Sequence, residues 1–137
     1  MADNARPTCL RGAPVLQVAD VVRSQAFYRD VLGFVSHGLW GDPPAFCIVQ
    51  RGEVTLMLDR SRGEGALPLN QYWAAYVYVD DVDALHAEFA AAGVEIARAP
   101  EDTFYGCRDF DVRDPDGHLI AFGQDLEPAP APGLRDE

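Results

Sequence analysis

The chain has 137 residues, 48% hydrophobic and 24% charged, which is typical of a soluble protein with one domain or two small modules. Its 22 acidic residues outnumber the 11 basic ones, and the net charge of −11 argues against nucleic acid and anionic membranes as partners. The three cysteines have no short Cys-x-x-Cys spacing, so neither a disulfide framework nor a zinc motif is expected. Residues 1–12 lack an apolar signal segment, and no apolar run approaches the ~20 residues of a membrane helix. We therefore expect a cytoplasmic protein.

The first half of the chain is predicted to run β-α-β-β-β. Residues 1–12 are polar and mixed in type, and we interpret them as an N-terminal arm. Apolar alternation or helical spacing predicts a strand over 13–19, a helix over 21–32, and strands over 34–39, 45–50 and 54–59. Asp20 is placed to cap the helix, Gly33 to end it, and Pro14 favours an edge position for the first strand.

The second half repeats this order after a linker over 61–72, which is rich in glycine. A strand is predicted over 73–79, a helix over 82–92 capped by Asp80 or Asp81 and ended by Gly93, a strand over 94–98 and a loop over 99–105. A β-hairpin follows, with strands over 108–113 and 119–122 joined by an Asp-Pro-Asp-Gly turn. Residues 126–137 alternate proline with alanine, and we expect a disordered tail.

The two halves also match in sequence. Val18-Ala19-Asp20-Val21 and Val79-Asp80-Asp81-Val82 occupy the same place in each half, immediately before the predicted helix. This correspondence indicates an internal duplication. The sequence therefore predicts an α+β fold of tandem βαβββ modules over 13–60 and 73–125.

Three stretches of the chain resemble the glyoxalase, bleomycin-resistance and extradiol-dioxygenase superfamily, also called vicinal oxygen chelate proteins. The first is Pro14-Val15-Leu16 through Asp20, followed by Phe27-Tyr28-Arg29-Asp30-Val31-Leu32-Gly33-Phe34. The second is Tyr76-Val77-Tyr78-Val79, and the third is Arg108 to Phe122 with its Asp-Pro-Asp-Gly turn. The resemblance covers about residues 13–125. It implies curved sheets around a cleft, with the helices on the outer face.

The resemblance also implies where metal-using relatives place their ligands, namely on the first and last strands of each module. Those positions fall on Ala13, Met57, Ala74 and Ala121. These side chains offer no nitrogen or oxygen to a metal ion, so neither a metal site nor another cofactor is expected. The histidines do not share a face as replacements: His86 lies mid-helix, His118 is expected to be exposed, and His37 follows the first helix.

Alternation along the strands indicates which residues share the cleft face. Tyr76 and Tyr78 share the face of Ala74, and Asp59 shares that of Met57. Cys107 stands next to Arg108, a cation that could lower the pKa of the thiol, although a half-buried structural thiol is the commoner case. The candidate ligand-binding residues are Trp40, Phe46, Met57, Asp59, Trp73, Tyr76, Tyr78, Tyr105, Cys107 and Arg108.

Acidic residues lie near this aromatic surface, namely Asp59, Asp109 and Asp111. Such a surface suits a flat or extended ligand, above all a cationic one. By resemblance, the closest type is the metal-free bleomycin-resistance protein, which implies a homodimer that sequesters an aromatic or cationic natural product. Two alternatives stay open. One is an enzyme of the same fold with a divergent metal site or a metal-free mechanism, and the other is a dimer whose cleft is filled by its own side chains. The arm over 1–12 is a candidate for exchange between subunits.

Overall fold

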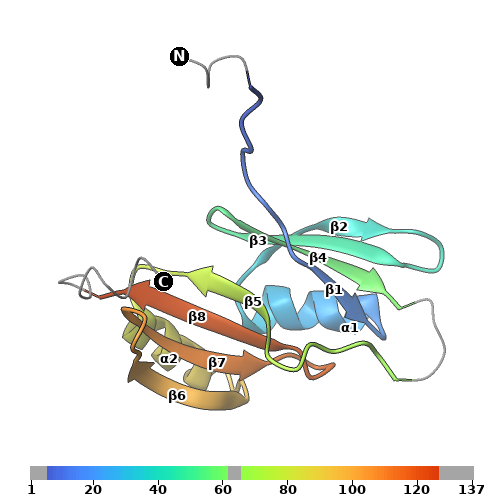
Figure 1. Ribbon diagram of the computed structural model, residues 1–137. Coiled ribbons are helices and arrows are strands. Elements are labelled where there is room, and N and C mark those ends of the chain that lie inside the picture. Colours follow the sequence, from blue (N-terminus) through green and yellow to red (C-terminus); the bar gives the residue numbers. More distant parts are fainter. Residues whose placement is uncertain (1–5, 62–65, 127–137) are drawn as a thin grey trace.

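A duplicated arrangement of strands and helices is visible in the computed structural model, which describes residues 6–61 and 66–126 (Figure 1). The first sheet contains β1 (Val15–Val18), β2 (Val35–Trp40), β3 (Phe46–Arg51) and β4 (Val54–Arg60). The second contains β5 (Trp73–Tyr78), β6 (Ile96–Asp102), β7 (Cys107–Arg113) and β8 (Leu119–Asp125). Helix α1 (Val21–Ala26) follows β1, and α2 (Val82–Ala91) follows β5. The predicted α+β fold of tandem βαβββ units is thus confirmed.

Both sheets have the same topology. The strand order is β1-β4-β3-β2 in the first and β5-β8-β7-β6 in the second, and in each the first strand pairs parallel with the last. The helix caps also correspond, because Asp20 accepts hydrogen bonds from the backbone N–H groups of Val22 and Arg23, and Asp81 accepts one from Ala84. Positions 61 residues apart are therefore structurally equivalent at the start of the two helices.

A single hydrophobic core lies between the two units. It includes Leu56 and Leu58 of β4 together with Val77 of β5 and Phe110 of β7. Because neighbouring residues of a strand point to opposite faces, the residues between these core positions face away from the core. We call this second face the open face of each sheet.

The first helix differs from its prediction as one continuous helix over 21–32. α1 ends at Ala26 and continues as a π-helical turn, η2 (Phe27–Val31), before Gly33 at φ +78°. From capping residue to glycine this segment is one residue longer than its counterpart, which runs from Asp81 to Gly93 at φ +83°. A π-helical turn absorbs one extra residue within a helix, and this explains the difference.

Two strands of the second sheet extend further than predicted. β6 runs from Ile96 to Asp102, so it starts later than the predicted strand over 94–98 and takes in part of the predicted loop over 99–105, including Pro100. Proline is tolerated there because β6 is an edge strand. β8 continues to Asp125, where its partner Cys107 begins β7.

The β7–β8 turn is held firmly against the first unit. The Tyr28 hydroxyl donates to buried Asp114 at 2.9 Å, and Arg23 pairs with Asp116 at 2.7 Å. His118 was expected to be exposed, and that expectation is wrong: its side chain packs onto β1, with Nε2 2.6 Å from the carbonyl oxygen of Gln17. The turn thus contributes to the interface between the units.

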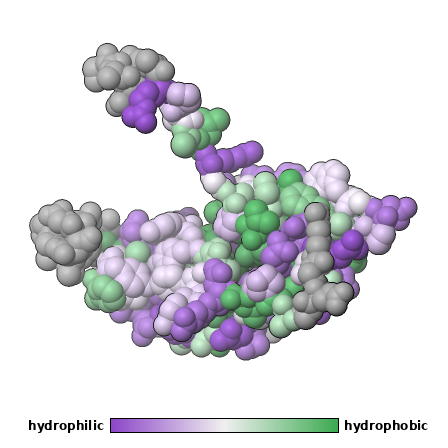
Figure 2. All heavy atoms as spheres, turned by 45° about the vertical axis from the view of Figure 1, so that its right-hand side comes forward, coloured by the Kyte–Doolittle hydropathy of each residue, from purple (hydrophilic) through white to green (hydrophobic). Residues whose placement is uncertain are grey.

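Segments at the ends of the chain contribute little to this arrangement. Residues 6–12 are exposed and stand clear of the body (Figure 2). The predicted linker has no helix or strand at 61 and 66–72, whereas 62–65 and nearly all of the predicted tail lie outside the described residues. No helix within 6–61 and 66–126 is long and apolar enough to cross a membrane.

Candidate functional site

The open face of the second sheet carries a cluster of aromatic and charged side chains. Asp109 and Asp111 of β7 point to this face, because Phe110 between them belongs to the core. Tyr76 lies beside them, since it pairs with Ala121 of β8, which in turn pairs with Asp111. We call six residues the aromatic–acidic cluster: Trp73, Tyr76, Arg98, Tyr105, Asp109 and Asp111.

Asp109 is the centre of this cluster and is fully buried. Its carboxylate accepts hydrogen bonds from the hydroxyls of Tyr76, at 2.8 Å, and of Tyr105, and from the Arg98 guanidinium at 2.5 Å. Burial by itself would raise the pKa of Asp109, but these three hydrogen bonds outweigh it and hold the pKa below its ordinary value. Conversely, burial and the bond to Asp109 raise the pKa of Tyr105 to about 12. At neutral pH the cluster therefore holds an ionised carboxylate and a neutral phenol.

Asp111 connects the cluster to the edge of the sheet. Two guanidinium nitrogens of Arg98 donate to its two oxygens at 3.0 Å each, and the indole N–H of Trp73 donates to it at 3.0 Å. Arg98 also pairs with Glu101 at 2.7 Å. Three carboxylates thus surround one guanidinium and leave a net charge of −2, which favours a cationic ligand.

Gly123 makes room for this arrangement. It pairs with Asp109 across the β7–β8 ladder, and a Cβ atom at this position would overlap the Tyr76 hydroxyl. The tyrosine ring therefore lies close over the β8 backbone, from which its hydroxyl reaches Asp109. The sequence pattern alone gave no reason to assign a role to this glycine.

Five aromatic rings form a row across the same face. Successive centroids are 5.1 Å apart for Tyr78 and Tyr76, 5.0 Å for Tyr76 and Trp73, 6.4 Å for Trp73 and Tyr105, and 5.1 Å for Tyr105 and Phe104. Trp73 and Tyr105 are 37% and 38% exposed although their polar atoms are hydrogen-bonded within the protein. These two rings are therefore fixed while they face the solvent, which suits stacking against a planar group.

The candidates of the first sheet form a separate group on its own open face. The ring centroids of Trp40 and Phe46 are 6.0 Å apart, and Phe46 pairs with Asp59 across β3 and β4. The side-chain amide of Gln17 donates a hydrogen bond to Asp59 at 3.3 Å. Met57 is half-buried on the same face. Within the described residues, no ring contact or hydrogen bond connects these side chains to the aromatic–acidic cluster. The predicted residues are thus brought together as two groups rather than one.

Cys107 and Arg108 do not act together as predicted. Cys107 lies on the open face, and burial raises the pKa of its thiol, which fits a structural thiol rather than a reactive one. Arg108 lies on the opposite face, where it pairs with Asp83 at 2.9 Å and Asp102 at 3.1 Å. Placing Arg108 in the site is therefore corrected: its charge is already paired beside α2.

The positions implied for metal ligands fall within or beside the open faces. Met57 and Ala121 lie on them, Ala74 lies in an irregularity of β5, and Ala13 precedes β1. In residues 6–61 and 66–126, no group of three or more His, Cys, Asp or Glu side chains is placed to hold a metal ion. His86 instead packs against Phe110, with the two ring centroids 5.3 Å apart.

Four residues of the site were not among the candidate ligand-binding residues: Arg98, Phe104, Asp109 and Asp111. The two aspartates were predicted only as acidic neighbours of the aromatic surface. Arg98 alternates on β6 opposite the two aspartates of β7, and this pairing of charges along neighbouring strands was the available signal. Phe104 fell in a predicted loop, and its contact with Tyr105 became visible only from the fold.

The duplicated βαβββ architecture defines the class of fold, and comparison with known sequences places the chain within it. A sequence profile described as the Glyoxalase/Bleomycin resistance protein/Dioxygenase superfamily matches residues 11–122. The chain therefore belongs to this superfamily. A bleomycin resistance protein of Geobacillus stearothermophilus is 27% identical over 133 residues, covering 86% of this chain and 98% of the relative. One from Staphylococcus aureus matches to the same extent.

Solved structures agree with this assignment. A bleomycin-binding protein from Streptomyces verticillus, solved with copper(II)-bleomycin, has a TM-score of 0.70 and 30% identity, over 89% of this chain and 100% of that one. A bleomycin resistance determinant encoded on the transposon Tn5 has a TM-score of 0.71 and 24% identity, over 85% and 98%. The second likeness concerns the fold alone.

Proposed function

We propose that this protein binds a bleomycin-like natural product, aromatic and cationic, and sequesters it without metal and without chemical change. The observation that carries this proposal is the row of half-exposed rings fixed above the ionised Asp109. Relatives named as bleomycin resistance and bleomycin-binding proteins support it.

The cluster has the physical properties that such binding needs. Its rings offer stacking at about 0.5–1.5 kcal/mol per aromatic pair and cation–π contacts at about 0.5–2 kcal/mol. The hydrogen bonds from Trp73, Tyr76 and Tyr105 to aspartates already fix those rings, so little side-chain freedom is lost when a ligand binds. The net negative charge attracts a cation at longer range.

We further propose that the complete site forms between two copies of the chain. The open face of the second sheet in one copy would meet that of the first sheet in the other, which brings Trp40, Phe46, Met57 and Asp59 opposite the aromatic row. Two observations support a homodimer: both open faces keep large apolar side chains exposed, and Leu10 in the arm over 6–12 is 90% exposed. Exchange of that arm between copies is part of the proposal.

The direct test compares Trp73→Ala with Tyr72→Ala, a matched control whose aromatic side chain is exposed outside the cluster. Isothermal titration calorimetry with metal-free bleomycin should give at least about tenfold weaker binding for Trp73→Ala, a loss of roughly 1.4 kcal/mol, and no change for Tyr72→Ala. If both variants bind bleomycin equally well, the aromatic–acidic cluster is not part of the binding site. Conversion of the antibiotic to a new product would favour the enzyme instead.

Sedimentation of the free protein measures its oligomeric state and so tests whether the complete site forms between two copies, as a composite site. A dimer is expected, and bleomycin binding should be regained when a Trp73→Ala chain is mixed with a Phe46→Ala chain, because one of the two composite sites is then intact. A monomer that still binds bleomycin would contradict the proposed pairing but not the cluster itself.

A further inference from the structure

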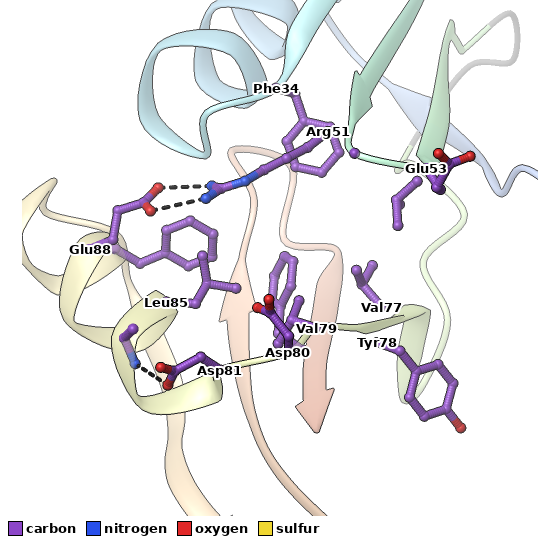
Figure 3. Close-up of a pocket in the computed structure, with 15 residues that line it drawn as sticks. Phe34, Arg51, Glu53, Val77, Tyr78, Val79, Asp80, Asp81, Leu85 and Glu88 are labelled. Carbon is purple, nitrogen blue, oxygen red and sulfur yellow. Dashed lines mark hydrogen bonds and ion pairs between the residues drawn. The ribbon is translucent and has the colours of Figure 1, made fainter. Parts of the chain in front are cut away.

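A cavity of about 420 Å³ lies between the two units on the helix side of β5 (Figure 3). This volume is within the range of small-molecule sites. Five residues form an apolar floor and are each at most 8% exposed: Phe34, Val77, Leu85, Phe89 and Phe122. The six residues of the aromatic–acidic cluster do not line this cavity, whereas Tyr78 at the end of the aromatic row does.

The duplication explains why a cavity is present here. The cavity lies beside α2, and the equivalent position beside the first helix is filled by the β7–β8 turn. This turn accepts hydrogen bonds from the side chains of Arg23, Ser24 and Tyr28. The equivalents 61 positions later are Ala84, Leu85 and Phe89, and all three line the cavity. They lack the guanidinium and hydroxyl groups that would hold a turn, so this place has an apolar surface instead.

The turns themselves also differ in length. Five residues separate the paired positions Arg113 and Leu119, whereas only Gly52 and Glu53 separate Arg51 and Val54. The shorter β3–β4 turn leaves the space beside α2 empty, and only the Arg51 side chain crosses its edge. Two guanidinium nitrogens of Arg51 bond to the two oxygens of Glu88, at 2.8 and 3.0 Å.

Carboxylates dominate the rim of this cavity. Glu53 approaches it from the first unit and Asp80 and Asp81 from the second (Figure 3). Four carboxylates line it against the single guanidinium of Arg51, a net charge of −3. Among the described residues, the carboxylates of Glu53 and Asp80 have no hydrogen-bond or ion-pair partner. An apolar floor with unpaired anions at its rim is complementary to a hydrophobic cation.

We propose that this cavity is a second binding site, for a small hydrophobic amine. The apolar part of the amine fills the space that the β7–β8 turn fills in the first unit, and its ammonium group pairs with Glu53 and Asp80. This site uses none of the six residues of the aromatic–acidic cluster, and the proposal does not rest on the antibiotic-binding function proposed for that cluster.

The test uses 4-phenylbutylamine as the probe and 4-phenylbutan-1-ol as its neutral counterpart, titrated into the full-length protein by calorimetry. The amine should bind with a stoichiometry of one per chain and about three- to tenfold tighter than the alcohol. Ala84→Trp, which fills the cavity from the exposed first turn of α2, should weaken both probes at least about tenfold. The control is Ala87→Trp, since Ala87 is exposed on the same helix but does not line the cavity.

Asp80→Asn gives a second test that does not change the packing. It should weaken the amine and leave the alcohol unchanged, while bleomycin binding stays as in the wild type. The proposal fails if the amine does not bind, or if Ala84→Trp binds it as tightly as Ala87→Trp does. It also fails if bleomycin displaces the amine, because the probe would then lie at the aromatic–acidic cluster. It fails as well if the amine binds only after residues 1–12 are deleted, because the arm of a second copy would then fill the cavity.

Discussion

Gly123→Ala is expected to disrupt the site through one added methyl group. The new Cβ would overlap the Tyr76 hydroxyl and ring, so the ring must move away from β8 and its bond to buried Asp109 breaks. A hydrogen bond to a charged group contributes about 1.5–3 kcal/mol. Overpacking costs about 1–3 kcal/mol, and alanine recovers roughly 0.5–1 kcal/mol relative to glycine in a strand. We expect a net loss of about 1.5–5.5 kcal/mol in the free energy of unfolding.

The assay is urea denaturation of Gly123→Ala, with Gly12→Ala as the matched control, since a Cβ at Gly12 meets nothing within 4 Å. Tyr76→Phe in the same background removes the overlapping hydroxyl. The double variant should therefore lose at least about 1 kcal/mol less than the sum of the single losses. If Gly123→Ala loses less than about 0.5 kcal/mol, or if the two losses simply add, the close approach of Tyr76 to β8 is not what holds the ring.

Three further predictions concern the buried polar groups. Asp109 has a folded-state pKa below its unfolded value of about 3.9, so its contribution to stability is present above pH 3.9 and is lost as the pH falls through the folded-state pKa. Urea denaturation between about pH 5 and 2 should therefore show the free energy of unfolding falling more steeply for the wild type than for Asp109→Asn, and parallel pH curves would contradict this. Burial raises the pKa of Cys47 and Cys107, whereas Cys9 is exposed. An aromatic disulfide reagent should therefore react rapidly with one thiol per chain, and this rapid reaction should be absent in Cys9→Ser. Rapid reaction of Cys107 would contradict the prediction. Tyr28→Phe should cost about 1.5–3 kcal/mol in urea denaturation, since Oδ2 of buried Asp114 loses the hydroxyl donor while Oδ1 keeps its two backbone donors, and a neutral result would show that the turn is not held in this way.

Local signals in the sequence accounted for most of the fold. Asp20 and Asp81 cap the helices and Gly33 and Gly93 follow them, because capping and positive φ depend on the residue itself and its nearest neighbours. The π-helical turn was not foreseen, since an inserted residue leaves no local mark and its accommodation depends on packing.

Alternation along the strands also placed Tyr76 and Tyr78 correctly on the open face. The same alternation puts Arg108 on the face of Phe110, and assigning it to the site by resemblance overrode that evidence. His118 was misplaced because its partner, the Gln17 carbonyl, is 101 residues away, and such contacts cannot be read from neighbouring residues. Arg98 was missed for the same reason, since both of its aspartate partners lie on another strand.

The central claim is metal-independent binding at the aromatic–acidic cluster. The most direct measurement is an intrinsic-fluorescence titration of the metal-stripped protein with bleomycin, repeated with added Ni²⁺ or Zn²⁺, in which Trp73 reports occupancy. The account predicts saturable quenching at about one ligand per chain, unchanged by either metal and of at least about tenfold weaker affinity in Trp73→Ala. A response that requires the metal, or quenching that persists at full affinity in Trp73→Ala, would contradict it.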